Sequence, residues 1–249
     1  MSVETSRHNH VLVVKMVRPE KRNALNRAIT AGIDSAMNEL EDNPELWCGI
    51  LTGTESVFSS GADLAEGPGE PTERGGIAGI ITRKRTKPLV AAVEGMALGG
   101  GLELVLCCDM VVASSAAVFG FPEVKRGLMP DFGGAFRISR FVPINVAREM
   151  LLTGTNITAE RAEDLGLVNT VVEPGKALSG ALALAEKICE NAPLAVRASL
   201  AIFNADVIGD ESEMWKLSDE THARLLRTED FKEGWTAFME RRTPKWIGM

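Results

Sequence analysis

Short apolar runs recur through the first two thirds of the chain, and they alternate with segments in which apolar residues recur at helical spacing. The β-branched run at 11–17 ends at Arg18-Pro19, which predicts a strand followed by a turn. Further short buried strands are predicted over 48–52, 89–93, 110–113 and 167–172. Asn26 is the expected cap of a helix whose apolar positions are Ile29, Ile33, Ala36 and Leu40, and which ends near Pro44. Strands that alternate with helices indicate an α/β domain.

From about residue 143 onward the apolar periods are mainly helical. Helices are predicted over 145–152, 158–165, 178–190, 194–204, 212–226 and 228–241. Thr158 and Thr228 are the expected N-caps of two of them, because acidic residues follow in the first turn, where the helix dipole favours them. Helices this apolar need a packing partner, and another subunit is one candidate. The segment 66–76 holds four glycines and two prolines in eleven residues, which predicts a loop, either a rim over a site or a plain surface loop.

The composition narrows the class of partner and the compartment. The 249-residue chain has a formal charge of −7, so we expect neither general nucleic-acid binding nor binding to anionic membranes. Its four cysteines, at positions 48, 107, 108 and 189, show no C-x-x-C spacing, which indicates reduced thiols in a reducing compartment. The first ten residues contain no apolar run, and no segment of the chain approaches the length of a membrane span. We therefore expect a cytoplasmic protein.

Several common kinds of site are absent from the sequence. His8 and His10 fall in a polar amino-terminal tail and His222 on a charged helix, and none has cysteine or carboxylate neighbours at metal-ligand spacing. No G-x-S-x-G elbow is present for a serine nucleophile. The triple glycine at 99–101 is followed by no Lys-Ser/Thr and lacks the G-x-G-x-x-G spacing, so it is neither a P-loop nor a dinucleotide turn. No metal and no cofactor are expected.

Three glycine-rich segments near the predicted strands hold the candidate chemistry. The triple glycine follows the strand at 89–93 and opens an apolar helical run, where free backbone N–H groups can bind an anion or a developing oxyanion. Glu103 lies in the first turn of that run, either as a functional carboxylate or only as a residue that complements the helix dipole. A second glycine turn spans 57–64. Downstream, Glu123 and Asp131 lie among Gly, Pro and apolar residues, where a carboxyl has a raised pKa that suits acid–base work near neutral pH.

Taken together, these segments make the chain resemble the enoyl-CoA hydratase (crotonase) superfamily over nearly its whole length. The matching stretches, in order, are RPEKRNALN at 18–26, FSSGADL at 58–64, ALGGGLE at 97–103, FGFPE at 119–123, and LTG at 152–154 with AEDLGLV at 162–168. The resemblance implies an α/β fold, a crotonase spiral of ββα units with a helical C-terminal trimerisation region. It divides the chain into a spiral core at 1–190, which holds an acyl-CoA site, and the trimerisation region at 191–249.

The resemblance also implies a reaction and its residues. The activity expected is the reversible hydration of a trans-2-enoyl-CoA to a 3-hydroxyacyl-CoA. The backbone N–H groups of Ala62 and Gly100 would hold the thioester oxygen, with Glu103 as the main water-activating base and Glu123 as the proton donor to Cα. The residues expected to meet the CoA moiety are Lys21, Arg22, Ala24, Ser60, Gly61, Asp63, Leu64 and Ala65. Phe238 and Arg241 resemble the tail residues that reach a neighbouring subunit's CoA, and a homotrimer or a dimer of trimers is expected.

Asp131 departs from the pattern of short-chain hydratases, which carry Gly after the equivalent of Pro130. A carboxylate here also occurs in isomerase members of the family and in members similar to carnitinyl-CoA dehydratase, which the segments 122–134 and 229–246 resemble most. Asp131 is thus a possible third catalytic carboxylate or a turn residue that bonds backbone N–H groups. Three alternatives to the hydratase therefore stay open: an acyl-CoA Δ-isomerase in which Glu123 and Asp131 move the proton, a carnitinyl-CoA dehydratase-type enzyme, and a non-catalytic acyl-CoA-binding protein.

Overall fold

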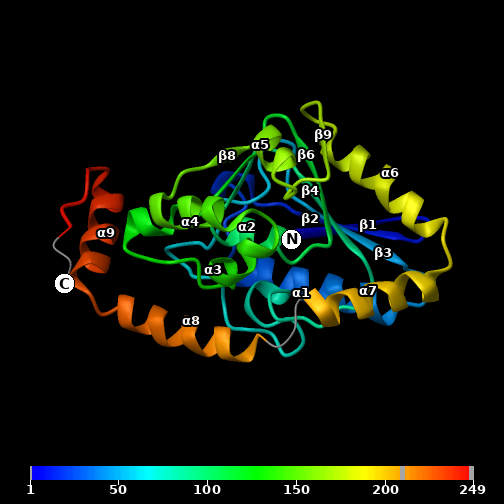
Figure 1. The fold of residues 1–249 in the computed structure, drawn as a ribbon, viewed down its shortest axis with the longest axis horizontal. Helices are drawn as coiled ribbons and strands as arrows, with labels where there is room; N and C mark the ends of the chain where they lie inside the picture. Colours follow the sequence, from blue (N-terminus) through cyan, green and yellow to red (C-terminus); the bar gives the residue numbers. More distant parts are fainter. Residues whose placement is uncertain (1, 208–210, 247–249) are drawn as a thin grey trace.

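The computed structural model of the protein describes residues 2–207 and 211–246. A six-stranded sheet forms its centre, with the strand order β1-β2-β3-β4-β6-β9, and it confirms the predicted α/β class (Figure 1). These strands are β1 (Val3–His8), β2 (Val11–Met16), β3 (Cys48–Thr52), β4 (Leu89–Val93), β6 (Met110–Ser114) and β9 (Thr170–Val172). β1 pairs antiparallel with β2, and each later neighbour pairs parallel. A second sheet contains β5 (Met96–Leu98), β7 (Val118–Gly120) and β8 (Ile157–Thr158).

Helices cover both faces of the large sheet, which explains why its parallel strands are continuous apolar runs rather than alternating ones. On one face Leu12 and Val14 belong to a buried cluster with the apolar stripe of α1 (Arg27–Asp42). On the other face Val11 and Val13 belong to a cluster with the alanines of α6 (Ala177–Cys189). The sheet is thus fully enclosed along its central strands, and its carboxyl ends are left to carry the loops of the site.

The remaining helices build out from this core. They are α2 (Gly100–Val105), α3 (Gly134–Arg137), α4 (Ile144–Thr153), α5 (Ala159–Asp164), α7 (Pro193–Val207), α8 (Ser212–Leu225) and α9 (Glu229–Glu240), with the 3₁₀ turns η1 (Pro19–Lys21), η2 (Ile77–Gly79), η3 (Pro122–Arg126) and η4 (Ile138–Arg140). Helices α7 and α8 follow one another along one long edge of the molecule, and α9 stands at the end of the molecule beyond α8 (Figure 1). The caps predicted at Asn26, Thr158 and Thr228 are confirmed, since each side chain accepts the N–H three residues on.

The structure corrects three expectations. The amino-terminal residues do not form a polar tail: Val3–His8 is strand β1, and its exposed, polar side chains hid the pattern because the strand lies at the sheet edge. The strand expected at 167–172 begins only at Thr170, since Leu167 and Val168 close the turn after α5. The short strands β5, β7 and β8, of two or three residues each, were not predicted. The loop at 66–76 is confirmed, and within the described residues no helix has the length and apolarity to cross a membrane.

A buried lysine ties α1 to the start of β4. Lys87 is only 3% exposed, and its ammonium donates to the carbonyl oxygens of Leu40 and Asn43, at 2.6 and 2.7 Å, where α1 ends. These carbonyls have no partner inside the helix, so a cation at this position satisfies them and complements the helix dipole.

Replacing Lys87 with Met keeps most of the side-chain volume but leaves the Leu40 carbonyl without a donor, and the Asn43 carbonyl keeps only the N–H of Leu46. We expect Lys87→Met to lower the free energy of unfolding by about 2–4 kcal/mol, measured by urea denaturation. The same change at the exposed Lys84 is the matched control and should alter stability by less than about 0.5 kcal/mol. Equal stability of the two variants would show that the buried ammonium does not hold the end of α1.

Candidate active site

Two glycine turns, distant in sequence, lie against each other at one end of the sheet. The segment around Ser59 pairs with β5: Ser59 N–H donates to Met96 O and Leu98 N–H donates to Ser59 O, both at 3.0 Å. Gly61 has φ +96°, and a Cβ on it would lie 2.9 Å from Leu98 O and 3.1 Å from Gly100 N. Only a glycine allows both this backbone conformation and this close approach. The start of α2 is therefore seated directly against the 59–65 loop.

This contact brings together the two backbone N–H groups that were predicted to hold the thioester oxygen, those of Ala62 and Gly100. A Cβ atom added to Gly100 would lie 3.3 Å from Ala62 N. Gly100 opens α2, so its N–H has no acceptor within the helix. The residues on either side of Ala62 both bond to Leu25: Leu25 N–H donates to Gly61 O at 2.8 Å, and Asp63 N–H donates to Leu25 O at 2.9 Å. The N–H groups of Ala62 and Gly100 themselves donate to no acceptor among the described residues. The two N–H groups are thus fixed side by side and are free to bind one oxygen atom.

A buried ion pair holds the loop that carries Ala62. Arg18 donates to Asp63 Oδ2 at 2.6 Å, to Glu66 Oε1 at 2.8 Å and to Ala24 O at 3.1 Å. Asp63 Oδ1 in turn accepts the N–H groups of Ala65 and Glu66, and the pairing with Arg18 lowers the pKa of Asp63 although burial opposes this. The Arg18 and Asp63 side chains are both nearly buried. Sequence reasoning missed Arg18, because nothing in its local pattern shows that it reaches across to position 63.

Two glutamates lie next to these N–H groups. Glu103, in the first turn of α2, is 2% exposed, and its Oε1 accepts the N–H of Gly134 at 2.8 Å, with a further bond from Phe132 N–H. Glu123, in η3, is half-buried; its Oε1 lies 2.8 Å from the Cβ position of Gly99, and its Oε2 is covered from solvent and bonded to no described atom. The structure therefore gathers the predicted carboxylates beside Gly99 and Gly100.

The pKa values of this pair depart from those of ordinary glutamates. Burial raises the pKa of Glu103 well above its usual value, and the charges of Glu123 and Asp131 raise it further. Burial raises the pKa of Glu123 to about 7; Asp131 adds to this and the Arg126 guanidinium opposes it. Two carboxyls that disfavour each other's ionisation share one proton over a range around neutral pH. The pair can therefore present one acid and one base at the same time.

The third predicted carboxylate is close to the other two. Asp131 lies in the turn before Phe132, and burial raises its pKa. His222 on α8 lies beside it, with its Nδ1 3.4 Å from Asp131 Oδ2. His222 lies on the charged helix predicted from the sequence, and no local signal in the sequence could have placed it beside Asp131. Among the described residues, no group of three or more potential metal ligands is found.

The residues expected to contact CoA lie on two segments that are joined by a backbone hydrogen bond, 21–24 and 60–65. Lys21 and Arg22 are exposed at the end of η1, and Arg22 O accepts the N–H of Ser60 at 3.0 Å, which places them beside Gly61, Leu64 and the exposed Ala65. Ala24 is buried under them. The carboxylate of Asp63 accepts from Arg18 and is nearly buried. No described contact tests CoA binding, and these assignments stay predictions.

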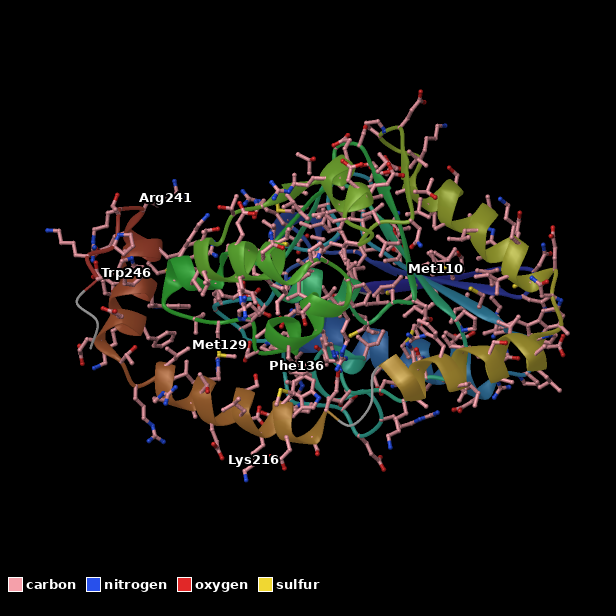
Figure 2. All side chains as sticks on the ribbon, viewed as in Figure 1. Met110, Met129, Phe136, Lys216, Arg241 and Trp246 are labelled. Carbon is pink, nitrogen blue, oxygen red and sulfur yellow. The ribbon has the colours of Figure 1, made fainter. Side chains whose placement is uncertain are left out.

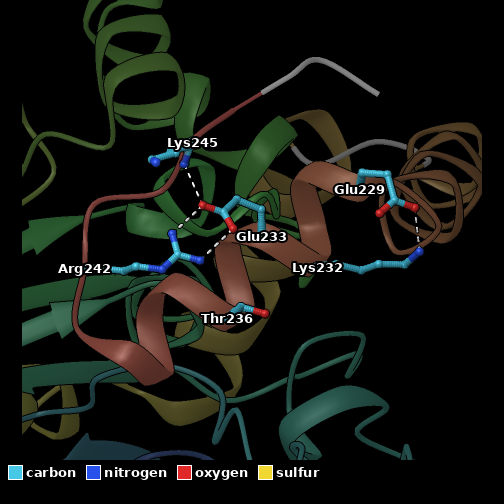
Figure 3. Close-up of a pocket in the computed structure, with 6 residues that line it drawn as sticks. All are labelled: Glu229, Lys232, Glu233, Thr236, Arg242 and Lys245. Atoms are coloured by element: carbon cyan, nitrogen blue, oxygen red, sulfur yellow. Dashed lines mark hydrogen bonds and ion pairs between the residues drawn. The ribbon is translucent and has the colours of Figure 1, made fainter.

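The other two predicted CoA residues lie on α9. The Phe238 ring is half-exposed, and the Arg126 guanidinium of the same chain lies 5.0 Å from its centroid. Arg241 ends the helix in an exposed left-handed conformation. On the outer side of α9, a cavity of about 480 Å³ is lined by Glu229, Lys232, Glu233, Thr236, Arg242 and Lys245. Its charged groups bond chiefly to one another, as in the pairing of Arg242 with Glu233, and they include none of the candidate carboxylates (Figure 3).

Comparisons with known proteins agree with this geometry. A family model described as enoyl-CoA hydratase/isomerase matches residues 6–249. The short-chain-enoyl-CoA hydratase of Clostridium acetobutylicum is 39% identical, over 97% of this chain and 95% of that protein. The carnitinyl-CoA dehydratase of Salmonella arizonae is 36% identical, over 99% and 98%. The crystal structure of carnitinyl-CoA hydratase from Mycobacterium avium has a TM-score of 0.95 at 40% identity, and the match covers 100% of this chain and 99% of that one. The predicted family and crotonase fold are thus confirmed, and the chain belongs to the enoyl-CoA hydratase/isomerase family.

Proposed function

We propose that the protein is a 2-enoyl-CoA hydratase, a hydro-lyase that adds water reversibly across the double bond of a trans-2-enoyl-CoA to give a 3-hydroxyacyl-CoA. One observation carries this proposal: the buried Glu103 and the half-buried Glu123 lie beside a pair of backbone N–H groups that have no acceptor among the described residues. Hydration needs a base for water and an acid for the neighbouring carbon. Glu103 and Glu123 provide both.

The N–H groups of Ala62 and Gly100 stabilise the charge that develops during the reaction. When hydroxide from water attacks Cβ, the electron pair of the double bond moves toward the thioester carbonyl, whose oxygen becomes an enolate. Two fixed donors bind this oxygen more strongly as its negative charge grows, and the loss of one such donor costs on the order of 3 kcal/mol in comparable sites. Gly100 is suited to this role because it opens a helix, where the dipole adds to the N–H donation.

The glutamates divide the proton transfers between them. In the proposed direction Glu103 takes a proton from water, and the N–H groups of Gly134 and Phe132 favour its ionised form. Glu123, whose pKa is raised to about 7, gives its proton to Cα. In dehydration the roles reverse, since the same atoms move back along the same path.

The CoA moiety is assigned to the loop surface around Ala62. We propose that Lys21 and Arg22 attract its phosphates against the acidic charge of the chain as a whole, while Ala24, Ser60, Gly61, Asp63, Leu64 and Ala65 line the adjacent backbone. Phe238 and Arg241 would reach the CoA of a neighbouring subunit. No metal and no redox cofactor enters the proposed reaction.

We also propose that residues 191–249 form an assembly region and that the protein is a homotrimer or a dimer of trimers. Supporting this, α7 exposes large apolar side chains: Leu194 and Ile202 are each 75% exposed in the single chain, and Phe203 is 63% exposed. Residues 208–210 and 247–249 of this region lie outside the described part of the chain. A cytoplasmic location is proposed from the four free thiols at Cys48, Cys107, Cys108 and Cys189.

The position of Asp131 supports a second candidate function. Its carboxylate lies close enough to Glu123 to raise the pKa of that residue, so the two could pass a proton along an acyl chain, as a Δ-isomerase requires. A carnitinyl-CoA dehydratase-type enzyme would keep the hydratase chemistry on a different acyl chain. A non-catalytic acyl-CoA-binding protein would bind the thioester and leave it unchanged.

Incubation with crotonyl-CoA separates these candidates. The hydratase loses its conjugated-enoyl absorbance and yields a product heavier by one water, measured by mass spectrometry. If crotonyl-CoA is unchanged, 3-butenoyl-CoA and crotonobetainyl-CoA follow: isomerisation of the first at unchanged mass identifies an isomerase, and hydration of the second identifies a carnitinyl-type enzyme. Calorimetric binding of all three without turnover would contradict every catalytic proposal.

Removing either carboxyl of the pair should stop hydration without loss of the fold. We expect Glu103→Gln and Glu123→Gln each to lower kcat by on the order of 100-fold or more, because each removes one proton transfer. Glu160→Gln, an exposed change of the same kind on α5, is the control and should leave kcat unchanged. Wild-type kcat in either site variant would assign the acid–base chemistry to other residues.

The Arg18–Asp63 ion pair should set the position of the Ala62 N–H. Asp63→Asn keeps the size of the side chain but weakens the bond to Arg18, so the loop loosens. We expect kcat with crotonyl-CoA to fall about tenfold or more, because a displaced donor stabilises the enolate less. Breaking a surface pair with Glu39→Gln, opposite the exposed Arg7, should change kcat little. An Asp63→Asn variant with only a raised KM would instead assign Asp63 to CoA binding alone.

A further inference from the structure

Helix α8 is anchored on the segment that follows Asp131. The Trp215 indole packs edge-on against Phe136, with ring centroids 5.1 Å apart, and its ring lies 3.1 Å from the Cβ position of Gly133. At the start of the helix Glu211 accepts from Arg137 at 2.7 Å and also pairs with Arg140. Figure 2 shows Phe136 between α3 and α8, on the side of α8 opposite the exposed Lys216. This end of α8 therefore has a fixed place over the turn that carries Asp131.

About two turns beyond Trp215, His222 faces Asp131. Its Nδ1 lies 3.4 Å from Asp131 Oδ2, and each side chain is 28% exposed. The Nδ1 atom itself is covered from solvent and makes no hydrogen bond of good geometry within the described residues. A covered ring nitrogen that faces a carboxylate at ion-pair distance is positioned for a charge interaction, which a purely structural histidine on a solvated helix face would not need.

The charged groups around this contact are few and mostly negative. On α8 itself, Asp219 faces Asp131 and raises its pKa, while His222 lowers it. The charge of Asp131 raises the pKa of Glu103 on α2. It also raises the pKa of Glu123 in η3, which the Arg126 guanidinium lowers. Arg137 of α3 is bonded to Glu211. His222 is therefore the basic side chain that α8 places against the cluster of Asp131, Glu103 and Glu123.

We propose that His222 is a positioning residue for the catalytic carboxylates and that it acts through Asp131: the imidazolium holds the Asp131 carboxylate in place and offsets its charge beside Glu103 and Glu123. This proposal rests on the proposed hydratase function. Glu103 must be ionised to accept a proton from water, and the charge of Asp131 opposes this ionisation. The added positive charge lets the base stay ionised at a lower pH than three uncompensated carboxylates would allow. The packing of α8 thereby affects the ionisation of Glu103.

The pH dependence of kcat/KM for hydration tests the proposal, since it reports the ionisation of the free enzyme. We expect His222→Gln to move the acid limb to higher pH by about half to one unit, because Glu103 then ionises beside an uncompensated Asp131. Asp131→Asn should move the acid limb to lower pH. The double variant should match Asp131→Asn alone, because His222 acts through Asp131. Lys216→Gln, which removes a positive charge from the exposed side of the same helix, should move neither limb.

Two results would overturn the proposal. A uniform fall of kcat/KM in His222→Gln with both limbs unmoved would assign His222 a structural role only. An equal shift of the acid limb by His222→Gln with and without Asp131 would show that the two residues act independently.

A readout without turnover distinguishes failure of this proposal from failure of the hydratase function. The chain has three histidines, so their ring resonances can be assigned by NMR from single substitutions. Asp131→Asn should shift the resonances of His222 and leave those of His8 and His10 unchanged. Unshifted His222 resonances would refute the pairing even in an active enzyme, and shifted ones in a protein that hydrates no enoyl-CoA would refute the function and keep the pairing.

Discussion

Like-charge repulsion between buried carboxyls is the constraint on which the site depends. Glu103 is almost fully buried, Glu123 lies beside it, and Asp131 adds a third acid within electrostatic reach. In a medium of low dielectric these groups do not all ionise together near neutral pH, so the cluster retains a proton. That retained proton is what an enzyme needs to add water in two complementary proton transfers. The rest of the fold serves to keep the carboxyls close despite their repulsion.

Backbone geometry supplies the opposing attraction. Gly134 donates its N–H to Glu103 and has no room for a side chain, since a Cβ there would lie 2.7 Å from the Phe121 ring. Gly61 and Gly100 let two chain segments approach until their free N–H groups are adjacent. The Arg18–Asp63 ion pair then fixes one of these segments, the 59–65 loop. Rigid backbone N–H groups of this kind suit the negative charge that we propose to develop on the thioester oxygen during the reaction.

Much of this could be predicted from the sequence, and the parts that could not share a physical reason. The buried strands, the capped helices and the glycine turns have local signatures, and the ordered motifs around Ala62, Glu103 and Glu123 identified the family. Strand β1 was missed because its polar side chains face solvent at a sheet edge and only its backbone pairs. His222 and Arg18 were missed because each acts on a residue far along the chain, Asp131 and Asp63, through a contact that only the folded chain creates.

A crystal structure with butyryl-CoA, which has no double bond to hydrate, tests the central claim most directly. We expect a thioester oxygen within hydrogen-bond distance of both Ala62 N and Gly100 N, with Cα and Cβ of the acyl chain between Glu103 and Glu123. Electron density that places the thioester oxygen away from either N–H group, or the acyl carbons away from the glutamate pair, would contradict it. The same structure would show whether Lys21 and Arg22 reach the phosphates and whether Phe238 does so from a neighbouring subunit.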